Sequence, residues 1–204
     1  MASKSIKHFF QSLKERIETY ESVSSFSEIS RRYFVINGFD GAVTILGIIL
    51  GTYMVGNTDP RIVIGSGLGS SLAMAISGFS GAYIAEKAER LRKMRELERS
   101  LFMDVNGTII EKASDFASIL IAAIDGLAPA LTSFIGLFPF ILCLKGIIQL
   151  KTATYISSLL IFILLFIMGS YIGKIARENV IKYGLLTFSA GLLVSLFSLL
   201  IGHI

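Results

Sequence analysis

The sequence predicts an all-α integral membrane protein of five transmembrane helices, with a short cytoplasmic helical extension, the N-terminus inside and the C-terminus outside. Three observations lead to this prediction. Hydrophobic residues make up 53% of the 204 residues and charged residues only 17%, against about 25% charged in a typical soluble domain. Five long stretches are almost free of charge, and Lys and Arg gather on one side of them. This composition excludes both a soluble globular domain and a disordered chain.

Five apolar segments are each long enough to cross the hydrocarbon core, which takes about 20 helical residues. They cover residues 33–55, 62–85, 116–144, 152–173 and 183–204, and the only acidic residues inside them are Asp40 and Asp125. One such segment could be a buried helix of a soluble protein. Five in so short a chain indicate transmembrane spans.

The distribution of Lys and Arg predicts the orientation. Sixteen of the nineteen lie before the first span, after the second or after the fourth. Because cytoplasmic loops carry the excess of positive charge, we expect a multi-pass protein of the cell membrane with a cytoplasmic N-terminus. The first apolar run begins at residue 33, too late for a cleavable signal peptide.

The segments outside the spans are also patterned. Residues 1–32 predict an amphipathic helix on the inner membrane surface, with apolar residues at helical spacing: Ile6, Phe9, Phe10, Leu13, Ile17 and Tyr20. Their basic charge then faces membrane lipid, and no nucleic-acid partner is expected. Residues 33–85 hold the first two spans, and residues 116–204 hold the last three. Between them, residues 86–115 predict a cytoplasmic helical segment that continues the second span and turns at Asn106-Gly107.

Few residues are suited to enzyme chemistry or to a resident cofactor. The chain has one cysteine, Cys143, and two histidines, His8 and His203, near opposite ends. This excludes a disulfide within the chain and disfavours a cysteine or histidine metal cluster and a Ser-His-Asp triad. We therefore expect no enzyme activity and no cofactor.

The two acidic residues at membrane depth are the main functional candidates, because ionisable groups inside spans are costly. Asn37, Asp40 and Thr44 lie on one face of the first predicted helix, followed by Gly47 and Gly51. In the third span, Pro129 removes the backbone hydrogen bond to the carbonyl of residue 125, beside the Asp125 carboxylate. Freed carbonyls near an acid are typical of cation sites in transporters. The alternative for both carboxylates is a cap or a hydrogen bond to a neighbouring helix.

The second span is unusually rich in small residues, with Gly, Ala or Ser at thirteen of the eighteen positions from 65 to 82. Such a composition permits close helix packing. Met74 and Ser77 lie on one stripe of this helix, and an antiparallel course places them at the depth of Asp40 and Thr44. Carboxylate, amide and hydroxyl oxygens suit Mn²⁺ and Fe²⁺, and a thioether favours Fe²⁺. One chain supplies few ligands, whereas a two-fold axis doubles the set.

Two motifs of this sequence resemble those of the vacuolar iron transporter family and its prokaryotic relatives. They are Asn37-Gly-Phe-Asp40-Gly41-Ala-Val-Thr44 with Gly51, and Ala75-Ile-Ser77-Gly78 followed by Ala82-Tyr-Ile-Ala-Glu86-Lys-Ala-Glu89 and Arg95-Glu96-Leu97. The resemblance covers residues 33–100. It implies a homodimer that exports divalent iron or manganese from the cytosol in exchange for protons, with Asp40 lining the path at the dimer interface.

The resemblance also implies that glutamates after the second span bind metal, and Glu89 and Glu96 match family positions. Glu86, Glu89 and Glu96 share one face of the predicted helix, where they either gather cations or form ordinary surface ion pairs. The chain departs from the family at three positions. Ser70 stands where the family often has Glu, Gly78 where it has Met, and Arg99 where a further glutamate falls.

Two other functions remain open at this stage. A membrane assembly protein without transport predicts Asp40 in a static hydrogen bond with no water-filled path. An intramembrane aspartyl protease requires Asp40 and Asp125 to share a proton, but the Gly-x-Gly-Asp context of such proteases is absent.

Overall fold

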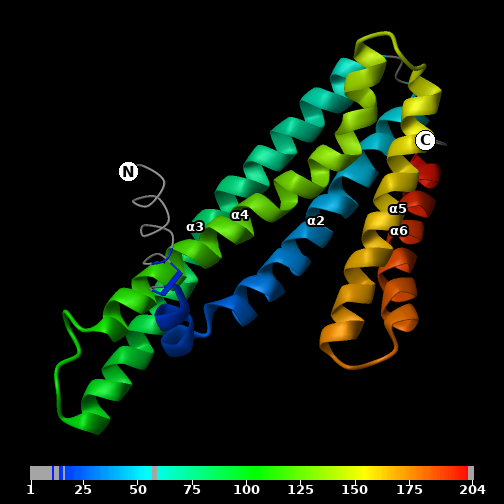
Figure 1. Cartoon of the computed structure of the whole chain (residues 1–204). Coiled ribbons are helices and arrows are strands. Elements are labelled where there is room, and N and C mark those ends of the chain that lie inside the picture. Colours follow the sequence, from blue (N-terminus) through cyan, green and yellow to red (C-terminus); the bar gives the residue numbers. More distant parts are fainter. Residues whose placement is uncertain (1–10, 12–13, 16, 57–58, 202–204) are drawn as a thin grey trace. The chain divides into compact units, whose positions relative to one another are not determined.

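The protein is all-helical in the computed structural model, which describes residues 11, 14, 15, 17–56 and 59–201. A helical stretch at residues 17–24 precedes five long helices (Figure 1). These are α2 (Phe26–Met54), α3 (Pro60–Leu101), α4 (Ile109–Leu144), α5 (Leu150–Ile175) and α6 (Val180–Ile201). All five are long and apolar enough to cross a membrane, so the predicted fold class is confirmed. Ile6, Phe9, Phe10, Leu13, His8 and His203 lie outside the described residues.

All five helices begin before the apolar segments that predicted them, and two begin much earlier. α2 starts at Phe26 and α4 at Ile109, seven residues before the predicted spans at 33 and 116. The reason is that apolar runs mark only the part of a helix in hydrocarbon, whereas helix ends are set by capping. Ser25 has a left-handed φ of 48°, and the Glu21 carboxylate accepts a 3.0 Å hydrogen bond from the Ser27 amide in the first turn of α2.

Several other helix ends carry recognisable capping or turn residues. Pro60 opens α3, where its missing amide leaves no hydrogen bond unmade, and the Asp59 carboxylate accepts from the Arg61 amide at 2.9 Å. The Asn179 side chain accepts from the amides of the first turn of α6 at 3.0 and 3.1 Å. Gly107 and Gly146, both with a φ of 73°, lie in the loops before and after α4. α3 continues unbroken from the second predicted span to Leu101, as expected.

The chain forms two compact units. Unit 1 comprises Met1–Tyr33 and Gly78–Asp125, and unit 2 comprises Phe34–Ser77 and Gly126–Ile204. Three helices pass from one unit to the other within their own length, namely α2, α3 and α4.

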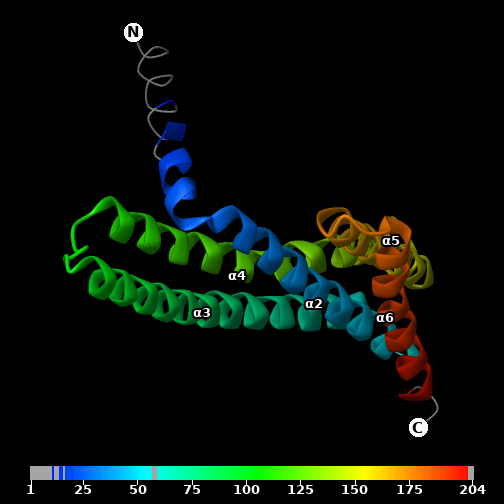
Figure 2. The ribbon, with the colours of Figure 1, turned by 90° about the horizontal axis from the view of Figure 1, so that it is seen from below.

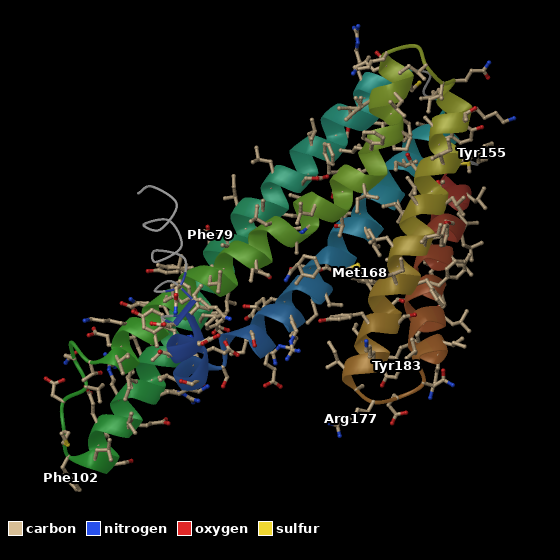
Figure 3. All side chains as sticks on the ribbon, viewed as in Figure 1. Phe79, Phe102, Tyr155, Met168, Arg177 and Tyr183 are labelled. Carbon is tan, nitrogen blue, oxygen red and sulfur yellow. The ribbon has the colours of Figure 1, made fainter. Side chains whose placement is uncertain are left out.

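In unit 1, the C-terminal half of α3 and the N-terminal half of α4 lie side by side (Figures 1 and 2). The start of α2 packs on them through a small aromatic cluster, in which Phe116 lies 5.4 Å from Tyr20 and 5.7 Å from Phe26 between ring centroids. Phe102, at the end of the α3–α4 hairpin (Figure 3), is 95% exposed. Unit 1 is therefore an antiparallel helix pair, and the N-terminal segment (residues 17–25) and the start of α2 pack on one side of it.

Unit 2 contains the larger apolar core, with buried residues from α2, α3, α4 and α5: Ala42, Ile45, Leu46, Ile49, Val63, Leu137, Phe140, Ala153, Ile161 and Leu165. α5 and α6 lie side by side in both views. Their close contact uses glycines: a Cβ at Gly191 would lie 2.7 Å from the Phe162 ring. The Thr187 hydroxyl donates across this contact to the Leu165 carbonyl at 2.8 Å.

A close approach of two backbones in unit 2 occurs at Gly41. A Cβ there would lie 2.6 Å from both Cα and O of Pro129 in α4, and it would also meet the Thr132 hydroxyl. The Ser133 hydroxyl donates to the Gly41 carbonyl at 3.4 Å. The glycine after Asp40 is therefore required by the α2–α4 packing, since no side chain fits between these backbones.

This packing predicts that Gly41→Ala destabilises the protein by about 1–3 kcal/mol or more, because the methyl group must displace backbone atoms of α4. Thermal unfolding of the purified protein in detergent measures the effect as a lower midpoint. Gly65→Ala is the matched control, because a Cβ at Gly65 meets nothing within 4 Å. Equal midpoints for the two variants would contradict the proposed role of Gly41.

Candidate functional site

Asp40 lies on the surface of its own chain. Its side chain is exposed on α2, and Asn37 and Thr44, one turn away on either side, are half-buried. The other face of α2 is buried in unit 2 through residues such as Ile45 and Ile49, both fully inaccessible. A carboxylate in an apolar span is therefore left uncovered by unit 2, although its exposure to hydrocarbon would cost about 2.5 kcal/mol or more.

The residues of α3 that were predicted to join this set also lie in unit 2. Met74 is half-buried and Ser77 is exposed. The hydroxyl of Ser70, where the family often has Glu, donates to the Gly67 carbonyl of its own helix at 3.0 Å. Among the described residues, no three His, Cys, Asp or Glu side chains come together as a metal site. A divalent ion therefore needs either non-carboxylate ligands or ligands from a second chain.

Sequence analysis missed the residues that hold α2 in place behind Asp40. Thr132 and Ser133, both buried on α4, contact α2 at Gly41, as described above. Met168 on α5 (Figure 3) is also buried, and its Cε lies 2.5 Å from where a Cβ at Gly38 would be. Hydroxyl and thioether side chains are common in spans, so these residues carry no signal in the sequence. The only signal for a close helix contact here is the pair of glycines, Gly38 and Gly41.

Asp125 has a different environment, inside unit 1. It is 4% exposed, and a Cβ at Gly78 would lie 3.0 Å from its Oδ2 and 3.3 Å from its carbonyl oxygen. The Asp125 carboxylate therefore occupies space that a side chain at position 78 would need. Gly78 and Asp125 thus form a matched pair, in which the small residue leaves room for the acid.

A cavity of about 330 Å³ in unit 1 collects most of the charged candidates outside the spans. Its walls come from the N-terminal segment, α3 and the start of α4, and its polar lining residues are Ser24, Ser25, Glu86, Glu89, Arg90, Lys93 and Ser114. Glu86 is buried, and Arg90 Nε lies 3.5 Å from its Oε2. The Tyr33 hydroxyl donates a hydrogen bond to Glu86 as well. The sequence pattern predicted the two glutamates but not the buried arginine beside them.

Glu96 does not line this cavity. It lies on a separate surface groove of α3 with Arg92, Arg95 and Arg99, because the cavity face runs from Glu89 to Lys93 and Leu97 in steps of four. Nearby, Lys87 binds Asp115 of α4 at 2.8 Å, and this hydrogen bond raises the pKa of the Lys87 ammonium. Glu86 and Glu89 therefore line the cavity and Glu96 does not, although Arg92 lies within ion-pair distance of both Glu89 and Glu96, at 3.0 and 3.9 Å.

Comparison with known proteins places these residues in a family context. Residues 31–103 match the VIT family. Over 195 residues the chain is 33% identical to an uncharacterised protein of Methanocaldococcus jannaschii, an alignment that covers 94% of this chain and 95% of that protein. The family match includes every site residue that the sequence predicted except Asp125.

The Gly78 and Asp125 pair predicts a coupled effect of substitution. Gly78→Ala alone should destabilise the protein, because the methyl group meets the Asp125 carboxylate. In an Asp125→Ala background the same change should cost less, with a coupling of about 0.5–3 kcal/mol. Thermal midpoints of the four proteins of this cycle measure the coupling, and strictly additive changes would show that the two positions do not interact.

Proposed function

The chain belongs to the VIT family of membrane proteins, and we propose that it moves divalent iron or manganese out of the cytosol in exchange for protons. The observation that carries this proposal is Asp40, a carboxylate within a span that lies on the surface of its own chain. Such a group needs a partner that compensates its charge. A transported divalent cation does this, and Asn37, Asp40 and Thr44 supply oxygens of the kind that Fe²⁺ and Mn²⁺ prefer.

The proposed transport site is shared between two copies of the chain. The absence of a three-carboxylate cluster among the described residues supports sharing, because a two-fold axis through α2 brings two copies of the same face together. Gly51, on the Asp40 face of α2, has nothing within 4 Å of a Cβ, and at Gly47 only Val194 approaches, at 3.7 Å. Small residues left unpacked on a span support a close helix contact with another subunit. Met74 and Ser77 on α3 are proposed as further ligands, and Asp125, enclosed within unit 1, is proposed as a separate candidate ligand.

The proposal also covers the segments outside the spans. Unit 1 is proposed to face the cytosol, where Glu86 and Glu89 gather cations from solution and Glu96 contributes to the surface charge. The N-terminal segment is proposed to lie on lipid at the inner surface of the cell membrane. Family membership favours transport over the aspartyl protease alternative, and the assembly protein remains the second candidate.

Asp40→Asn is expected to abolish metal transport while leaving the protein folded, because an amide keeps the size of the side chain but loses the negative charge that binds the cation. Uptake of Mn²⁺ into proteoliposomes that contain a metal-sensitive dye measures transport. Gel filtration in detergent checks folding. Full transport by this variant would remove Asp40 from the mechanism, and absence of transport by the wild type as well would favour the assembly alternative.

The shared site predicts a disulfide across the two-fold axis. A cysteine at position 47 or 51, in a Cys143→Ser background, is expected to crosslink two chains in native membranes under mild oxidation. A cysteine in place of Leu159, an exposed residue of α5, serves as the control that should not crosslink. If neither position on α2 gives a crosslinked dimer, the proposed axis is wrong.

A further inference from the structure

We propose that Arg90 competes with the incoming metal ion for Glu86 and thereby sets the metal affinity of the cavity in unit 1. This inference rests on the proposed function, since it concerns how cations are gathered before transport. It assigns a role to a positive side chain that lies inside the cavity of a cation transporter, where it would otherwise repel the substrate.

Arg90 and Glu86 form a buried ion pair on the cavity wall. Both side chains are 11% exposed, and Nε of Arg90 lies 3.5 Å from Oε2 of Glu86. The two residues are one turn apart on α3, so the pair forms without help from another element. A metal ion that reaches Glu86 therefore meets a carboxylate whose charge Arg90 already balances.

The guanidinium of Arg90 makes fewer hydrogen bonds than a well-formed buried salt bridge would. Nε and Nη2 of Arg90 are buried, and neither has a hydrogen-bond partner of normal geometry among the described residues. The 3.5 Å separation exceeds the 2.7–2.9 Å of a well-formed charged hydrogen bond. Burial also lowers the pKa of the Arg90 guanidinium, although Glu86 lies beside it. A buried cation with unmade hydrogen bonds is costly, so a stronger competitor can displace it.

The charges of the cavity suit a divalent competitor. Its second carboxylate, Glu89, faces Lys93 with Nζ 3.6 Å from Oε1, and Arg92 also binds this oxygen at 3.0 Å. One divalent ion brings the same two positive charges that Arg90 and Lys93 supply to the two glutamates. The side chain of Lys93 is 65% exposed and moves freely into water, whereas Arg90 is enclosed. Arg90 is therefore the residue whose displacement opposes metal binding.

The test measures Mn²⁺ uptake by proteoliposomes as a function of Mn²⁺ concentration. Arg90→Met, which keeps an unbranched apolar stem but removes the guanidinium and its charge, is expected to lower the apparent KM roughly three- to tenfold with an unchanged maximal rate. Arg90→Lys keeps the charge and should keep a KM close to that of the wild type. A purely structural role would instead lower the amount of folded protein or the maximal rate. If Arg90→Met does not fold, Arg90→Gln carries the same prediction.

Arg95→Met is the matched control, because Arg95 is on the same helix but lines the separate groove rather than the cavity. Its KM should stay near the wild-type value. In a Glu86→Gln background, Arg90→Met should no longer lower KM, since the carboxylate for which the two cations compete is gone. The inference is overturned by an unchanged or higher KM in Arg90→Met, by an equal fall in Arg95→Met, or by the same fall without Glu86.

Equilibrium binding separates this inference from the proposed function. Electron paramagnetic resonance of free Mn²⁺ measures binding to the purified protein in detergent, independently of transport. If the wild type takes up no Mn²⁺ into liposomes, the proposed function fails. Tighter Mn²⁺ binding by Arg90→Met would still support the competition, and unchanged binding would overturn it.

Discussion

The approach of α2 to α4 at Gly41 is the constraint on which the placement of the candidate ligands depends. A side chain at position 41 would overlap the backbone at Pro129, so this side of α2 has to face α4. Successive residues of a helix are about 100° apart, and the preceding residue, Asp40, is therefore turned away from α4 to the surface of the chain. The Asp-Gly dipeptide thus joins a packing requirement to a functional one: the glycine fixes the rotation of α2, and this rotation determines where the carboxylate points.

Four acidic residues among the candidates, Asp40, Glu86, Glu89 and Asp125, fall into two kinds. Glu86 and Glu89 are balanced by basic side chains of their own helix, and Asp125 is enclosed by unit 1. Asp40, by contrast, is exposed within an apolar helix. A charge of this kind is tolerated when something outside the chain compensates it. Because of this contrast, Asp40 is the proposed ligand of the transported ion, and the glutamates have only the proposed role of gathering cations.

Periodicity and charge were sufficient to predict the spans, the long extension of α3 and the Asp40 stripe, because a membrane imposes length and polarity directly on the sequence. They could not predict helix starts, which depend on local caps such as Glu21 for α2. Nor could they show that Asp125 fills the space above Gly78, or that Arg90 is buried against Glu86, because both depend on tertiary packing. Glu96 was grouped with Glu89 by a seven-residue spacing, but the cavity follows a four-residue step.

The most direct test of the central claim is metal uptake by the wild-type protein reconstituted in liposomes. Vesicles loaded with a metal-sensitive dye are exposed in turn to Fe²⁺, Mn²⁺, Zn²⁺ and Ca²⁺, with a pH-sensitive dye in parallel vesicles. We expect Fe²⁺ or Mn²⁺ to enter well above the rate in protein-free vesicles, Ca²⁺ not to do so, and protons to move in the opposite direction. Uptake no faster than in protein-free vesicles for all four metals would contradict this expectation.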